Sequence, residues 1–111
     1  MAQNIKLIVY PVKDIEKSKA FFGKFLDLEP YVASPYYVGY KVGNLEVGLD
    51  PNSKLGPIAY ADVTDIKSSL QAMVKVGAEI IQDAKEVGGG LWIAKVKDVD
   101  GNVVGLRQQP K

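Results

Sequence analysis

The chain has 111 residues, of which 47% are hydrophobic and 24% charged, as is ordinary for one soluble globular domain. Its net charge is +1 and its basic and acidic residues are interleaved, so we expect no nucleic-acid partner. No apolar run approaches the ~18 residues of a membrane span and the start has no signal-peptide pattern, so we expect no membrane partner and a cytoplasmic protein. The absence of cysteine and histidine removes disulfides, thiolate chemistry and the commonest metal ligand.

The first half of the chain predicts a strand, a helix and three more strands. Apolar alternation over residues 5–10 predicts the first strand. Asp14 is a suitable N-cap for an amphipathic helix that ends at Leu26 and directs Phe22 and Phe25 inward. β-rich segments separated by turn residues predict the other strands, at residues 31–33, 36–42 and 45–50.

The second half repeats this order after residues 51–57, a polar, proline-containing linker. A helix over residues 65–76 is expected to bury Ile66, Leu70, Met73 and Val74. The Asp-Gly pair inside residues 98–102 is a hairpin signal. The strands are predicted at residues 58–62, 79–82, 91–97 and 103–108.

Two pairs of segments suggest an internal duplication. Residues 11–18 recur as residues 62–69 with Val, Asp, Ile and Ser in register, and residues 43–49 resemble residues 101–106. We therefore predict an α+β fold of two tandem βαβββ modules within a single domain, with the first at about residues 1–50 and the second at about residues 58–111.

A duplicated βαβββ unit with these motifs resembles the vicinal oxygen chelate superfamily, which includes glyoxalases, bleomycin-resistance proteins, extradiol dioxygenases and fosfomycin-resistance enzymes. The stretch from Pro11 to Phe22 is similar to the family's first helix entry, and the stretch from Asp98 to Asn102 to its Asp-Pro-Asp-Gly-Asn turn. The resemblance covers nearly the whole chain. It implies a mixed sheet curled into a cup, helices on the outside, a ligand inside and a homodimer.

The resemblance also implies a metal held by His, Glu or Gln side chains from the first and last strands of each module. The matching positions here are Leu7, Gly48, Ile58 and Gly105. None of these side chains offers a nitrogen or oxygen donor, so we expect no metal and no other cofactor. Glu46 and Asp50, two residues either side of Gly48, are the fallback ligands; otherwise they are an exposed strand residue and a turn residue.

Without a metal, the cup would have an apolar floor of Leu7, Ile58 and the two glycines, with space for an organic ligand. Arg107 shares a strand face with Gly105, so it is expected either to reach an anionic or carbonyl group on the ligand or to be solvated. Aromatic side chains on predicted strands are the expected walls, unless they fill the core: Tyr37, Tyr40, Tyr60 and Trp92.

We therefore predict a metal-free protein of the bleomycin-resistance type that sequesters an apolar or aromatic ligand. The nearly neutral chain fits a neutral or anionic ligand better than a cationic drug. Two alternatives stay open. One is a divergent glyoxalase-like lyase or isomerase, or a dioxygenase-like enzyme, which requires a titratable group inside the cup. The other is a structural dimerisation module whose aromatic side chains fill the cup.

Overall fold

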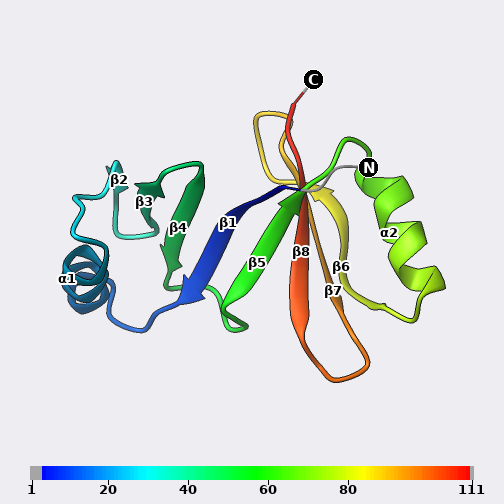
Figure 1. Cartoon of the computed structure of the whole chain (residues 1–111), viewed down its shortest axis with the longest axis horizontal. Helices are drawn as coiled ribbons and strands as arrows, with labels where there is room; N and C mark the ends of the chain where they lie inside the picture. The colour runs from blue at the N-terminus through cyan, green and yellow to red at the C-terminus, as the bar shows by residue number, and fades with distance from the viewer. Residues whose placement is uncertain (1–3, 111) are drawn as a thin grey trace. The chain divides into compact units, whose positions relative to one another are not determined.

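Each half of the chain folds as a strand, a helix and three further strands, which confirms the two tandem βαβββ modules (Figure 1). The structure is a computed structural model that describes residues 4–110. The chain divides into two compact units, and the break falls between Ile58 and Ala59. The first unit comprises residues 6–58 and the second comprises residues 59–110 together with Asn4 and Ile5, so each unit corresponds to one module except at the first residues of each module's first strand.

The first module is a mixed sheet with one helix. Its strands lie in the order β2-β3-β4-β1, with β1 parallel to β4 and the other neighbours antiparallel. The parallel pair requires a crossover connection, which the helix and the β2–β3 hairpin supply. The elements are β1 (Asn4–Pro11), α1 (Ile15–Leu26), β2 (Val32–Ala33), β3 (Val38–Val42) and β4 (Leu45–Asp50).

The second module repeats this topology, with the strand order β5-β8-β7-β6 and a parallel β5–β8 pair. Strand β6 extends to Glu86, beyond the predicted end at Gln82, because pairing with β7 holds a polar segment that lacks apolar alternation. Two register irregularities accompany this pairing. The elements are β5 (Ile58–Asp62), α2 (Ile66–Lys75), β6 (Glu79–Glu86), β7 (Trp92–Lys97) and β8 (Val103–Gln108).

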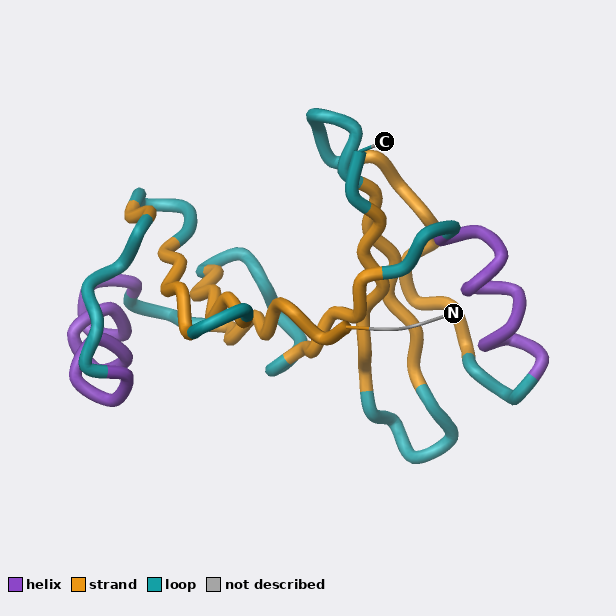
Figure 2. Tube along the Cα trace, turned by 45° about the horizontal axis from the view of Figure 1, so that its top comes forward, coloured by secondary structure: helices purple, strands orange, loops and turns teal. Residues whose placement is uncertain are grey.

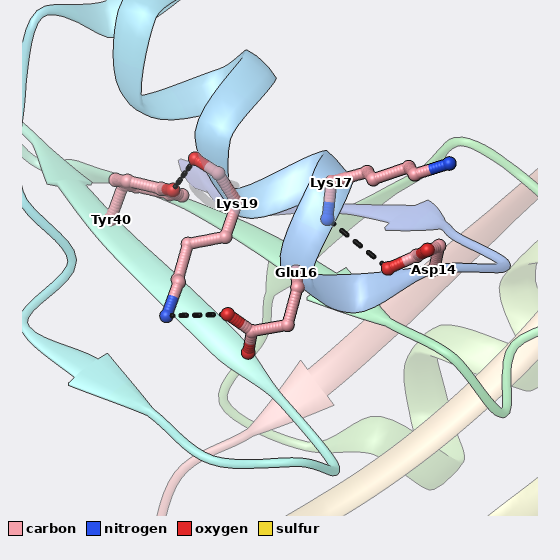
Figure 3. A network of polar contacts seen from close by, with 5 residues as sticks. All are labelled: Asp14, Glu16, Lys17, Lys19 and Tyr40. Atoms are coloured by element: carbon pink, nitrogen blue, oxygen red, sulfur yellow. Dashed lines mark hydrogen bonds and ion pairs between the residues drawn. The ribbon is translucent and has the colours of Figure 1, made fainter.

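The two helices begin with the same capping interaction. The Asp14 carboxylate accepts a hydrogen bond from the Lys17 backbone N–H at 3.2 Å (Figure 3), and Asp65 accepts one from the Ser68 N–H at 3.2 Å. Figure 2 shows each helix beside the strands of its own module. Neither of these helices, which are the two in the described part of the chain, is long and apolar enough to cross a membrane.

In the first module, α1 packs on the sheet face that carries Tyr40 and its buried apolar neighbours. Ile15, Phe22 and Leu26 align along the helix and cover this face. Phe25 is rotated by about 80° from Ile15 at 100° per residue, and it is 71% exposed. The prediction that Phe25 points inward is therefore wrong, because it lies at the margin of the apolar stripe.

In the second module, α2 buries Ile66 and Leu70 against the sheet, with Met73 half-buried beside them. Val74 lies about 80° around the helix from Ile66 and is 45% exposed. Its predicted burial is also wrong, for the same geometric reason. The helix-covered core of this module includes Ala94, Val96 and Leu106.

Candidate functional site

Strand register identifies the face of the first module that lies opposite α1, here called its helix-free face. Residues paired between neighbouring strands point to the same side of a sheet. Leu7 pairs with Glu46, and Gly48 pairs with both Val9 and Gly39. Because Tyr40 and Leu49, at the alternate positions, pack under α1, these five residues belong to the helix-free face.

The Tyr37 ring fills the space beside Gly48. A Cβ atom added at Gly48 would lie 2.7 Å from Cζ and 2.8 Å from Cε1 of Tyr37, closer than side-chain atoms approach. Gly39 is equally confined, since its added Cβ would lie 2.9 Å from Tyr31 Cε1 and 3.1 Å from Tyr37 Cε2. The prediction that Gly48 leaves room for a ligand is therefore corrected: a tyrosine ring takes that room.

Glu46 is the centre of a polar cluster on this face. The Tyr31 hydroxyl donates a hydrogen bond to Glu46 Oε1 at 2.8 Å, and the Tyr37 hydroxyl donates one to Oε2. Lys41, which pairs with Glu46 across β3 and β4, holds its Nζ 4.7 Å from the centroid of the Tyr31 ring. A half-buried carboxylate, two phenols and an ammonium group thus lie together, and we call Tyr31, Tyr37, Lys41 and Glu46 the Glu46 cluster.

Asp50 does not join this cluster. Its carboxylate accepts a hydrogen bond from the Asn52 N–H at 2.8 Å, which is the turn role that the sequence allows. Glu46 and Asp50 are four residues apart on one strand, which corresponds to about 13 Å at ~3.3 Å per residue. Their carboxylates do not converge on one point, so the fallback pair does not form a metal site.

In the second module, the Tyr60 ring covers Gly105. The two residues pair across β5 and β8, and a Cβ atom added at Gly105 would overlap the ring, with Tyr60 Cγ only 2.9 Å away. Tyr60 is 5% exposed, and Ile58, two residues before it on β5, is fully buried. The two last-strand glycine positions are thus both covered by tyrosine rings.

Arg107 also lies on this face of the second module, but it is held by Asp62. Arg107 Nε donates to Asp62 Oδ1 at 2.7 Å and its NH2 group donates to Oδ2 at 3.3 Å. Their side chains are 13% and 19% exposed, so the pair is largely buried. This two-point ion pair fixes the guanidinium across the β5–β8 pair, a third role beyond the ligand contact and the solvated strand end that the sequence suggests.

Tyr40 and Trp92 lie on the helix-covered faces, so they do not line the faces described above. Tyr40 is fully buried and donates its hydroxyl to the Lys19 carbonyl of α1 at 2.8 Å (Figure 3). Burial, and secondarily the negative charge of Glu29, raise the pKa of Tyr40. Trp92 packs against the core under α2, beside a groove of about 840 Å³ between α2 and β6, with Lys67 Nζ 5.6 Å from its ring centroid.

The residues at the positions that would hold a metal do not fit one. Leu7 and Ile58 offer only hydrocarbon, and the space a longer side chain would need at Gly48 and Gly105 is taken by tyrosine rings. Within residues 4–110, no three side chains of His, Cys, Asp or Glu are grouped as metal ligands are.

Two members of the Glu46 cluster, Tyr31 and Lys41, are not among the residues predicted from the sequence. Tyr31 lies just before the short strand β2, where no alternation gives a direction to its side chain. Lys41 on β3 and Glu46 on β4 each stand between two apolar neighbours, and this is a signal that could have found the face once the two strands are paired.

Comparisons with known proteins find likeness in structure only. No family model matches the sequence, and no curated protein matches it. A hypothetical protein from Bacillus halodurans C-125 aligns with a TM-score of 0.81 at 15% identity, covering 100% of this chain and 97% of that one. A glyoxalase/bleomycin resistance protein/dioxygenase superfamily member from Vibrio splendidus 12B01 aligns at 0.68 and 20% identity, covering 96% and 98%.

A methylmalonyl-CoA epimerase of Streptomyces coelicolor aligns with a TM-score of 0.73 at 11% identity, covering 98% of this chain and 96% of that one. At such identities the likeness concerns the fold and not the chemistry. The chain has the vicinal oxygen chelate fold, the fold of the glyoxalase/bleomycin resistance/dioxygenase superfamily.

Proposed function

We propose that this protein binds a small, neutral aromatic molecule without a metal, and that the Glu46 cluster orients it. The observation that carries the proposal is the Glu46 carboxylate, fixed by the Tyr31 and Tyr37 hydroxyls on the helix-free face of the first module. The homodimer implied by the family resemblance remains a prediction, which sedimentation equilibrium would test.

The donor chemistry at the four metal positions supports the metal-free part of the proposal. A divalent cation needs several oxygen or nitrogen atoms that converge on it. The corresponding residues are apolar, and two of them are glycines beneath tyrosine rings. Binding energy must then come from buried apolar area and from a few oriented hydrogen bonds.

The polar groups of the Glu46 cluster favour a ligand that carries a hydrogen-bond donor. Each oxygen of a carboxylate has two acceptor sites, and each Glu46 oxygen receives one phenol hydrogen bond, so the carboxylate retains acceptor capacity. The Tyr31 and Tyr37 rings offer stacking surface. Glu46 repels an anion and Lys41 repels a cation, so a neutral ring with a hydroxyl or amino group fits best.

A second candidate function uses the same groups for chemistry. A carboxylate fixed in position can take a proton from a substrate bound beside it, so the cluster would also serve a metal-free enzyme with Glu46 as general base. Replacing Glu46 by Gln would distinguish the two roles. If Glu46 is a general base, the variant loses catalysis entirely. If Glu46 only accepts a hydrogen bond from the ligand, the variant binds the ligand more weakly, because the Gln carbonyl oxygen is still an acceptor.

A neutral fluorescent phenol, 2-naphthol, is a direct probe of the proposed site. We expect saturable binding in a fluorescence titration, and the Glu46→Gln variant should weaken it by about tenfold or more, because hydrogen bonds to a charged group contribute about 1.5–3 kcal/mol. Tyr37→Phe, which keeps the ring, should weaken it less. Glu16→Gln removes an exposed α1 carboxylate that pairs with Lys19 and is the matched control. Equal affinity in the Glu46 and Glu16 variants would reject the site.

A further inference from the structure

The two modules differ sharply at the contact between helix and sheet. In the first module, the rings of Tyr10 and Phe22 pack with centroids 4.9 Å apart, and Phe21 lies 5.2 Å from Phe22. Alignment of the repeated segments, residues 11–18 with 62–69, makes the second-module counterparts small or flexible. Ala61 replaces Tyr10, and Ala72 and Met73 replace Phe21 and Phe22, while Ala59 replaces Ile8.

A cavity of about 320 Å³ lies at this contact in the second module, between α2 and the strands β5 and β8. The residues that replace the first-module rings all line it. Its walls include Ala59, Ala61, Ala72, Met73, Val104 and Leu106. Truncated side chains in a packed interior leave a cavity when the backbone does not collapse, and Ile66, Leu70 and Leu106 form the core that holds α2 on the sheet beside this cavity.

The cavity is apolar and open. Ser69 is the one lining residue with a polar side chain among the described residues. Ile5 and Val104, which also line it, are 58% and 37% exposed, so the cavity opens to the surface beside them. A charged ligand would lose its hydration there without gaining a partner.

We propose that this cavity is a binding site for a small neutral aromatic molecule, which occupies the place that the Tyr10 and Phe22 rings hold in the first module. The site is separate from the Glu46 cluster, because it lies on the helix-covered face of the other module. Its volume is at the lower end of the ~300–1,000 Å³ range of small-molecule sites. A dry apolar cavity of about half this size is known to take up benzene.

Met73 gives the cavity its own reporter. The chain has two methionines, so a sample labelled with 13C in the methionine methyl groups gives a very simple NMR spectrum. Titration with toluene should move the Met73 methyl signal in a saturable way, because the ring current of an aromatic molecule in the cavity changes the chemical shifts of nearby nuclei. The variant Ala61→Phe returns a ring to the cavity and should weaken toluene binding by about tenfold or more.

Ser68→Phe adds the same ring to an exposed position of α2 outside the cavity and should leave toluene binding unchanged. Should Ala61→Phe fail to fold, Ala59→Ile, which introduces the first-module residue, takes its place. Absence of a saturable Met73 shift in the unmodified protein overturns the proposal. Unchanged toluene binding in both Ala61→Phe and Ala59→Ile also overturns it. The proposal is also overturned if the Met73 methyl signal moves with protein concentration in the absence of toluene, because a second copy of the chain then occupies the cavity.

Discussion

At the scale of single residues, tyrosine rings fill the space beside two of the four metal positions, where a metal-binding side chain would have to stand. Each module places a glycine on its last strand beneath a tyrosine ring, Gly48 under Tyr37 and Gly105 under Tyr60. The two rings come from different places, since Tyr37 precedes β3 and Tyr60 lies within β5. Val9, not a tyrosine, is the first-module counterpart of Tyr60. The glycine–tyrosine contact therefore arises separately in each module.

Close packing makes the Gly105–Tyr60 contact sensitive to one methyl group. Gly105→Ala would force a Cβ into the Tyr60 ring, so we expect a loss of about 1–3 kcal/mol in the free energy of unfolding, measured by urea denaturation. In a Tyr60→Leu background the same change should cost clearly less. An equal cost in both backgrounds would show that the ring does not confine Gly105.

Tyr40 should make stability depend on alkaline pH. Burial first, and the Glu29 charge second, raise its pKa in the folded protein, so the unfolded chain releases this proton at a lower pH than the folded one. The stabilisation by the neutral phenol is complete below the ordinary tyrosine pKa of about 10 and is lost as the pH rises through the folded-state pKa.

The variant Tyr40→Phe lacks this proton and also the hydrogen bond to the Lys19 carbonyl. The difference in unfolding free energy between the natural protein and this variant should be constant from about pH 8 to 9 and narrow above about pH 10. Denaturant unfolding across this range measures it. A difference that stays constant at high pH would contradict a raised pKa.

At the scale of secondary-structure elements, α1 has one half-buried and one exposed phenylalanine about a turn apart. Phe22 packs against Tyr10 and the sheet core, whereas Phe25 is 71% exposed. We expect Phe22→Ala to lower the free energy of unfolding by about 1.5–3 kcal/mol and Phe25→Ala by less than about 1 kcal/mol. Equal losses would mean that Phe25 is covered in solution, for example by a second chain.

Local sequence signals were sufficient to predict most elements. Asp14 caps the first helix as predicted, and Asp65, its counterpart in the repeat, caps the second helix, which begins one residue later than predicted. The faces of the strands could not be assigned in the same way. On β3 the apolar residues Val38, Tyr40 and Val42 alternate with Gly39 and Lys41, but alternation alone does not tell whether the apolar face is covered by a helix or lines a cup. The packing of α1 on the sheet decides this, and pairing between strands brings Lys41 beside Glu46.

At the scale of the whole molecule, the two modules have the same topology but different side chains at the contact between helix and sheet. Both modules keep the strand order and the parallel pairing of first and last strand. They differ in side chains that do not change this topology, with aromatic packing under α1 and small residues under α2. One backbone plan thus supports a filled contact in one module and a cavity of about 320 Å³ in the other.

The absence of donors at all four metal positions gives a prediction for the intact protein. A ligand that binds only the folded state raises stability by RT ln(1 + [L]/Kd), so a metal at 100 times its Kd would add about 2.7 kcal/mol. We expect no increase in melting temperature with nickel, zinc, manganese or iron(II), no decrease with EDTA, and no stoichiometric metal in elemental analysis of protein purified without chelator. Glu46→Gln should respond in the same way as the natural protein. A stoichiometric metal with clear stabilisation, lost in Glu46→Gln, would contradict the metal-free proposal and make the Glu46 carboxylate a ligand.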